Sequence, residues 1–139
     1  MSELQEGQKA AVCEELEIQR AKLKTLKSCR LGGPSGIVIP PYRVMQRAET
    51  DSWHLRASNH DEYVFCHNDL SQQNIIVDPI TLKIKAIIDW EYAGFFPPSF
   101  DYPFYNRLGP SSAINGEVDD SLDLLQFLRS EKLSLSTLR

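Results

Sequence analysis

The sequence predicts a single α+β domain that is mainly helical and carries a small β-hairpin near its centre. Apolar residues recur at helical spacing near both ends of the chain. Between them, residues 75–88 contain two short runs rich in β-branched residues, separated by a turn signal. A length of 139 residues suits one domain rather than two.

Composition and charge exclude several classes of protein. A net charge of −4 and a pI near 5.3 argue against nucleic acid as a partner, because phosphate binding requires a basic face. No apolar run approaches the roughly 20 residues of a membrane helix, and the polar start lacks the pattern of a signal peptide. Three cysteines without a CxxC pair support neither a disulfide framework nor a zinc site. We therefore expect a cytoplasmic protein with no membrane partner.

Residues 3–30 are predicted to form a helix. Its apolar positions follow the helical period: Val12, Leu16, Leu23 and Leu26. Lys and Arg gather in its second half, where the helix dipole favours them, and the pair Gly32-Gly33 ends it. We expect this amphipathic helix to pack against the rest of the domain. The alternative is that it forms a coiled coil or binds a partner protein.

Residues 31–62 are predicted to be a connector, because they contain too many helix and strand breakers for long regular structure. The GGPSG stretch at 32–36 is the only glycine cluster. It does not fit a phosphate-binding loop, since no Lys-Ser/Thr pair follows and Pro34 lacks an N–H donor. We interpret it as a turn.

Residues 63–90 hold the most informative pattern. Their apolar runs are Tyr63–Cys66, 75–77 and 84–88, and the turn signal DPIT stands between the last two. We interpret 75–88 as a hairpin. A regular register with Asn74 opposite Asp89 pairs the intervening residues as follows: Ile76 with Ile87, and Asp78 with Lys85.

This register would bring two oxygen ligands together. Directly opposite residues lie roughly 4.5–5.5 Å apart, so the amide of Asn74 and the carboxylate of Asp89 could share a hard cation such as Mg²⁺. Asp69, five residues before Asn74, could then accept a proton from an attacking hydroxyl, and His67 could brace the loop. Taken singly, these Asp and Asn residues could equally cap turns or end strands.

The aromatic and proline-rich segment after the hairpin shows no clear period and is predicted to wrap irregularly over the core. Asn115-Gly116 marks a turn, and a helix is predicted from about 119 to 130 within the C-terminal part, 111–139.

Two stretches resemble a known family. "HNDLSQQNIIVD" is similar to the H-G-D-x-x-x-x-N loop of the aminoglycoside phosphotransferase and choline kinase group, with Asn68 where glycine is usual. "AIIDWEYAGFFPP" is similar to the group's I-D-W-E-x-A-G segment, the counterpart of Asp-Phe-Gly in protein kinases. The resemblance covers about residues 60–110, and fungal-type phosphotransferase-domain proteins look most similar.

The resemblance implies the C-terminal lobe of a protein kinase-like fold. It further implies Asp69 as the catalytic base, His67 as its support, and Asn74 and Asp89 as ligands of Mg²⁺ beside ATP. Glu91 would be an accessory residue at the metal. Nothing before residue 63 supplies the glycine-rich loop or the strand lysine of an N-terminal lobe.

We therefore expect residues 1–139 to be a single incomplete domain: a truncated ATP-dependent phosphotransferase for a small-molecule hydroxyl, weakly active or inactive alone. A separate N-terminal lobe or protein partner would complete it. One alternative is a non-catalytic, pseudokinase-like interaction module. Another is metal-dependent hydrolysis, including nuclease chemistry, with His67, Asp69 and Asp89 around one metal. The net negative charge of the chain argues against a nuclease. The sequence does not identify the substrate.

Overall fold

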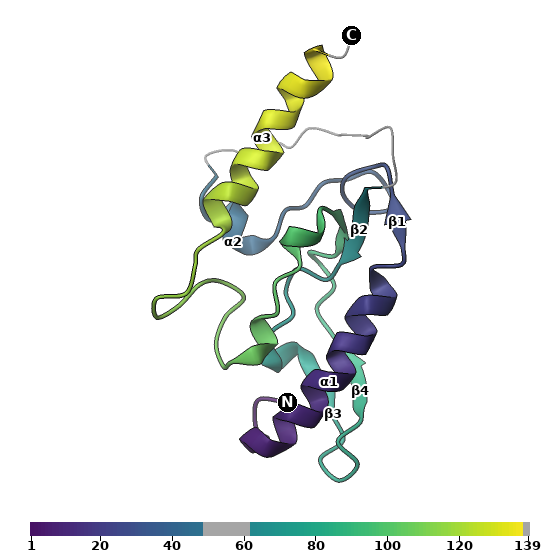
Figure 1. The fold of residues 1–139 in the computed structure, drawn as a ribbon, viewed down its shortest axis with the longest axis vertical. Helices are drawn as coiled ribbons and strands as arrows, with labels where there is room; N and C mark the ends of the chain where they lie inside the picture. Colours follow the sequence, from purple (N-terminus) through teal and green to yellow (C-terminus); the bar gives the residue numbers. More distant parts are fainter. Residues whose placement is uncertain (49–61, 138–139) are drawn as a thin grey trace.

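The computed structural model describes residues 1–48 and 62–137, so the part of the predicted connector at 49–61 lies outside the described residues. Its helices and strands, in chain order, are α1 (Glu6–Leu23), β1 (Lys27–Ser28), α2 (Tyr42–Met45), β2 (Tyr63–Cys66), β3 (Ile75–Val77), β4 (Ile84–Ile87), β5 (Gly94–Phe96) and α3 (Ser121–Thr137) (Figure 1). No helix within these ranges is long and apolar enough to cross a membrane. The α+β class is confirmed.

In the described part of the chain, the strands form a three-stranded antiparallel sheet with β2 between β1 and β5, and a separate β3–β4 hairpin. The prediction that residues 94–96 are irregular was wrong. Gly32 and Phe95 exchange two backbone hydrogen bonds of 2.9 and 2.8 Å, which hold β5 at the sheet. Both glycines at this crossing are needed: a Cβ on Gly94 would lie 3.0 Å from backbone atoms of Gly32, which itself has a φ of +100°.

Helix α1 ends at Leu23, seven residues before the predicted end at residue 30. The chain leaves the helix because the next residues join the sheet: Lys27 pairs with Val64, and the carbonyl of Leu26 accepts a 3.1 Å hydrogen bond from the N–H of Phe65. The Leu26 side chain is 52% exposed. Its place in the helical period was therefore coincidental, because strand pairing decides the conformation here.

The predicted C-terminal helix is present as α3, which begins at Ser121 and extends to Thr137. Asp119 caps it: its carboxylate accepts hydrogen bonds from the backbone N–H and the hydroxyl of Ser121, at 2.9 and 2.6 Å. These bonds and the guanidinium of Arg47 lower the pKa of Asp119 to about 2. The cap explains why the helix starts two residues later than predicted.

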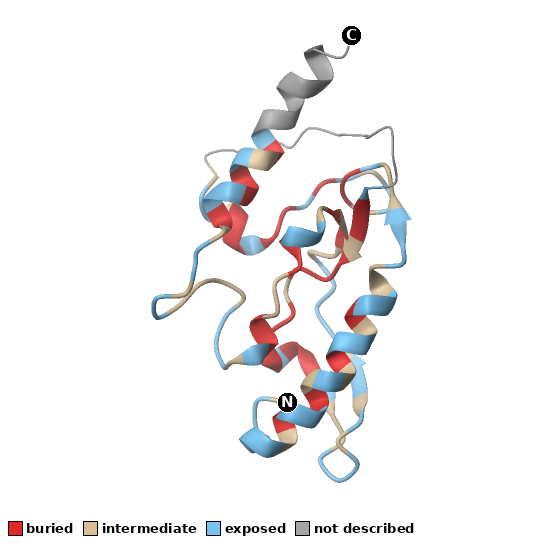
Figure 2. Ribbon diagram, viewed as in Figure 1, coloured by how far each residue is buried: buried red, intermediate tan, exposed pale blue. Residues whose placement is uncertain are grey.

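Buried residues form two clusters. Figure 2 shows where the buried residues lie along the ribbon. The first joins the three-stranded sheet to α2 and α3, through residues such as Phe96, Phe100 and Leu125. The second joins α1 to the segment before the hairpin and to the hairpin itself; its members are Val12, Leu16, Leu70, Ile75 and Tyr105. Because Leu70 and Ile75 are both in this cluster, the polar stretch between them is anchored at each end.

Candidate active site

The imidazole of His67 links two polar segments of the predicted site. Its Nδ1 accepts a 3.1 Å hydrogen bond from the backbone N–H of Asp69, and its Nε2 lies 2.9 Å from the carbonyl oxygen of Ile88. Since Nδ1 accepts, the proton is on Nε2 and the ring is neutral. The residue is 1% exposed, and this burial lowers its pKa. His67 thus fixes the start of the loop against the end of β4.

The backbone of Asp69 is held from a second direction by Asn74. The Nδ2 of Asn74 donates a 2.7 Å hydrogen bond to the Asp69 carbonyl oxygen, which also accepts from the N–H of Ser71 at 3.0 Å. Asn74 is 3% exposed. Because Nδ2 is engaged, Oδ1 is the atom of this amide that remains for a cation.

The hairpin is present, but its predicted register was wrong by one residue. Ile75 pairs with Ile87 and Ile76 with Ala86, and a shift follows between Ile76 and Val77. The turn departs from a regular ladder. The Asp78 carboxylate accepts hydrogen bonds from the N–H groups of Ile80 and Thr81, and Leu82 adopts a φ of +59°. The N–H of Asp78 donates a 2.9 Å hydrogen bond to the carbonyl of Lys83, not to a residue of the predicted register.

Asn74 and Asp89 are nevertheless close in the fold. The N–H of Ile88 donates a 2.9 Å hydrogen bond to the carbonyl of Asn74, and Asp89 is the next residue. Asp89 is exposed and adopts a φ of +59°. Within the described residues, no three His, Cys, Asp or Glu side chains gather as a metal site. The proposed pair, the amide of Asn74 and the carboxylate of Asp89, is smaller than such a group. Magnesium binding by this pair therefore stays a prediction.

Asn68 occupies a conformation that favours glycine. Its φ is +71°, in the left-handed region, where asparagine is tolerated better than most residues. Its Nδ2 donates a 3.0 Å hydrogen bond to the carbonyl of Tyr92, and the residue is 4% exposed. The asparagine side chain, at a position where the similar phosphotransferases usually have glycine, thus connects the loop to the segment after Asp89.

A cleft of about 310 Å³ opens beside Asp69. Its lining residues come from segments far apart in sequence: Tyr42, Gln46, Asn68, Asp69, Gln73, Glu91, Tyr92 and 110–112. Among the predicted site residues, Asp69 and Glu91 therefore share this cleft. The rings of Tyr42 and Tyr92 lie 6.3 Å apart. Sequence reasoning missed both tyrosines. Tyr92 occupies the unspecified x position of the I-D-W-E-x-A-G segment, and Tyr42 comes from the predicted connector.

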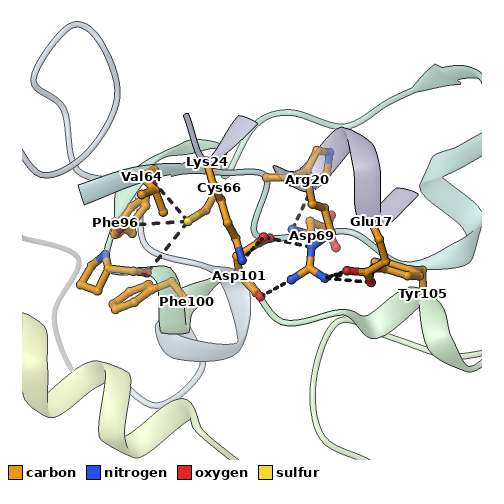
Figure 3. Close-up of polar contacts among 12 residues, drawn as sticks. Glu17, Arg20, Lys24, Val64, Cys66, Asp69, Phe96, Phe100, Asp101 and Tyr105 are labelled. Carbon is orange, nitrogen blue, oxygen red and sulfur yellow. Dashed lines mark hydrogen bonds and ion pairs between the residues drawn. The ribbon is translucent and has the colours of Figure 1, made fainter. Parts of the chain in front are cut away.

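A polar network around the buried Arg20 links several segments next to the loop (Figure 3). Arg20 on α1 binds Asp101 twice, from Nε to Oδ2 at 3.1 Å and from Nη2 to the carbonyl oxygen at 2.8 Å. Its Nη1 contacts the hydroxyl of Tyr105 at 3.0 Å, and that hydroxyl also binds Glu17. The carbonyl of Tyr105 accepts a 2.9 Å hydrogen bond from Gln72 in the loop. The network thus connects α1 to the segment between Asp69 and Asn74.

Comparison with known proteins identifies the family of this chain. Residues 24–105, more than half of the chain, match the model of the Phosphotransferase enzyme family. The chain is 48% identical over 44 residues to "Probable choline kinase 3" of Arabidopsis thaliana, which covers 32% of this chain and 12% of that protein. It is 45% identical over 56 residues to "Ethanolamine kinase 2" of Homo sapiens, and this match covers 40% of this chain and 14% of that protein.

A third similarity is to "Casein kinase II subunit alpha'" of Saccharomyces cerevisiae, 38% identical over 64 residues, covering 42% of this chain and 18% of that protein. No solved structure matches. The matched stretches thus span less than a fifth of each of these relatives. The family match contains both the His67–Asn74 loop and the Asp89 segment, and the chain belongs to the phosphotransferase enzyme family.

Proposed function

We propose that this chain forms the C-terminal-lobe part of an ATP-dependent phosphotransferase that acts on a hydroxyl group of a small molecule. The observation that carries the proposal is the double fixation of Asp69, by His67 on its N–H and by Asn74 on its carbonyl. The same two residues contact Ile88, next to Asp89: His67 through its ring nitrogen, and Asn74 through its backbone carbonyl. A base and two oxygen ligands are thereby held on one framework.

Asp69 would act as the general base. Asp69 lines the cleft, where a substrate hydroxyl would reach its carboxylate. As the hydroxyl oxygen forms its bond to the γ-phosphorus of ATP, its proton passes to Asp69, and the bond from that phosphorus to the bridging oxygen breaks to release ADP. The fixed backbone holds the carboxylate in place, which is the main contribution a protein makes to this reaction.

The oxygen atoms of Asn74 and Asp89 fit a hard cation, since one is a neutral amide oxygen and the other an exposed carboxylate. These two residues would hold Mg²⁺, and Glu91 would assist. The ion, when bound, would neutralise charge on the phosphates of ATP.

Exposed apolar side chains near Asp89 support the proposal that a further lobe packs there. Three large apolar side chains are exposed there, Ile76 at 42%, Ile88 at 39% and Trp90 at 41%. Residues 1–62 contain neither a glycine-rich loop nor a lysine strand of the kind that clamps nucleotide. We infer that a separate N-terminal lobe covers this face, and that residues 1–139 alone turn over slowly or not at all.

The cleft chemistry favours an amine-bearing alcohol as substrate. Tyr42 and Tyr92, whose ring centroids lie 6.3 Å apart, line the same cleft as the acidic residues Asp69 and Glu91. Aromatic faces and carboxylates together attract ammonium groups. The relatives named choline kinase and ethanolamine kinase point to substrates of this type.

Paramagnetic Mn²⁺, used in place of Mg²⁺, tests the ligand pair by NMR. We expect the amide signals of residues near 74 and 89 to broaden first, and the effect to disappear in Asp89→Asn. Asparagine suits this control because it tolerates the φ of +59° at this position. Broadening that is strongest at exposed acids such as Asp123, or that survives in Asp89→Asn, would refute the assignment.

A further inference from the structure

One wall of the cleft beside Asp69 is a segment without regular secondary structure. Residues 110–112 line the cleft and belong to the stretch 107–117. This stretch has few buried apolar anchors: Leu108 is 56% exposed, and Val118 just beyond it is 80% exposed. Hydrophobic packing therefore does not explain why this wall has a defined position.

The guanidinium of Arg107 supplies the missing support. Its Nη1 donates a 2.6 Å hydrogen bond to the carbonyl of Pro110, and its Nη2 donates a 2.6 Å bond to the carbonyl of Ser112. Both acceptors belong to residues that line the cleft. One side chain therefore holds the wall on either side of Ser111.

Arg107 is itself fixed by an ion pair with Glu117. Its Nε and Nη2 contact the two carboxylate oxygens at 3.0 and 2.8 Å, a paired geometry that only a guanidinium provides. The same carboxylate accepts a 3.0 Å hydrogen bond from the N–H of Ile114. The guanidinium also lies 5.2 Å from the centre of the buried Phe104 ring. These contacts connect the loop to the core.

We propose that Arg107 is a positioning residue for substrate binding: it sets the position of the 110–112 wall and hence the width of the cleft that this wall lines together with Glu91 and the two tyrosines. The proposal rests on the proposed function, because it takes this cleft as the site of the hydroxyl substrate. Arg107 does not touch the reacting atoms in this account. Its effect passes through the carbonyls that it holds.

The test is a comparison of choline and ethanolamine binding by NMR titration of the full chain. Arg107→Gln removes the paired geometry and the charge, and Arg107→Lys keeps only the charge. We expect the dissociation constant for choline to rise by about tenfold or more in both, because a displaced wall loses its contacts with the ligand. Arg47→Gln is the matched control: it removes an exposed ion pair with Asp119, and we expect a change below about twofold.

A second variant covers the case in which Arg107→Gln fails to fold. Glu117→Gln leaves both carbonyl contacts possible and weakens only the ion pair, so we expect a smaller loss of choline binding. Unchanged binding in a folded Arg107→Lys, or no binding of either amine by the folded wild-type chain, would overturn the inference. The metal experiment at Asp89 judges the proposed phosphotransfer site separately, since it does not involve this wall.

Discussion

The N–H of Asp69 donates a hydrogen bond to Nδ1 of His67 at 3.1 Å, and this bond exists only while the imidazole is neutral. The opposite ring nitrogen is engaged by the carbonyl of Ile88 at 2.9 Å. Protonation of Nδ1 would replace an acceptor with a donor facing another donor. The position of the proposed base is therefore coupled to the charge of a buried histidine.

His67 should make stability depend on pH below about 6.5. Burial lowers its pKa in the folded chain, so the unfolded chain binds more protons between the folded value and 6.5. The free energy of unfolding should then fall as pH decreases through this window, by at most about 1.4 kcal/mol per pH unit. Urea denaturation at pH 7.5, 6.5 and 5.5 measures the slope.

The comparison with His67→Gln isolates this contribution, because His54 and His60 are present in both proteins. The variant should be less stable at pH 7.5 but should lose less on acidification. Glu117 and Asp119, whose pKa values are lowered to about 2, stay ionised throughout the range. Parallel pH profiles for the two proteins would contradict the account of His67.

Asn68 provides a test of backbone conformation. Asn68→Gly removes the hydrogen bond to Tyr92 but also removes the backbone strain of a non-glycine residue at positive φ. We therefore expect the free energy of unfolding to change by less than about 1 kcal/mol. Asn68→Ala loses the bond and keeps the strain, and it should cost about 1–2 kcal/mol more than the glycine variant. Chemical denaturation of the pair checks this, and equal stabilities would contradict it.

The buried Arg20–Asp101 pair should be far more important for stability than the exposed Arg47–Asp119 pair. The side chains of Arg20 and Asp101 are 10% and 4% exposed, whereas those of Arg47 and Asp119 are 49% and 42% exposed. Arg20→Met leaves a buried carboxylate without its guanidinium and should cost about 3–5 kcal/mol. Arg47→Met should cost about 1 kcal/mol or less. Similar losses in urea denaturation would show that the network in Figure 3 is not structural.

The sequence predicted the elements that depend on local pattern. The strand at 63–66 and the hairpin were predicted correctly, because short apolar and β-branched runs next to a turn signal are typical of β-strands. The register was not found, because side-chain hydrogen bonds from Asp78 set the geometry of the turn. The end of α1 was missed for a related reason: strand pairing at Lys27 overrides the helical period.

The cleft could not be predicted from sequence. Tyr42, Tyr92 and Ser111 come together only after the two clusters of buried side chains have formed, and no spacing rule connects them. By contrast, the motif residues His67, Asp69 and Asn74 lie within eight positions, so a single loop determines their arrangement. Local motifs thus indicated the chemistry, whereas the binding space depended on tertiary packing.

The most direct test of the central claim is a calorimetric titration of magnesium-ATP into the purified chain, with Asp89→Asn as the control. The account predicts weak but measurable binding by the wild-type chain. Binding should weaken by at least about tenfold in Asp89→Asn, because the variant loses the carboxylate that, with the Asn74 amide, is proposed to hold the ion. No binding by the folded wild-type chain, or equal binding by the variant, would contradict the claim that Asn74 and Asp89 form a nucleotide-metal site.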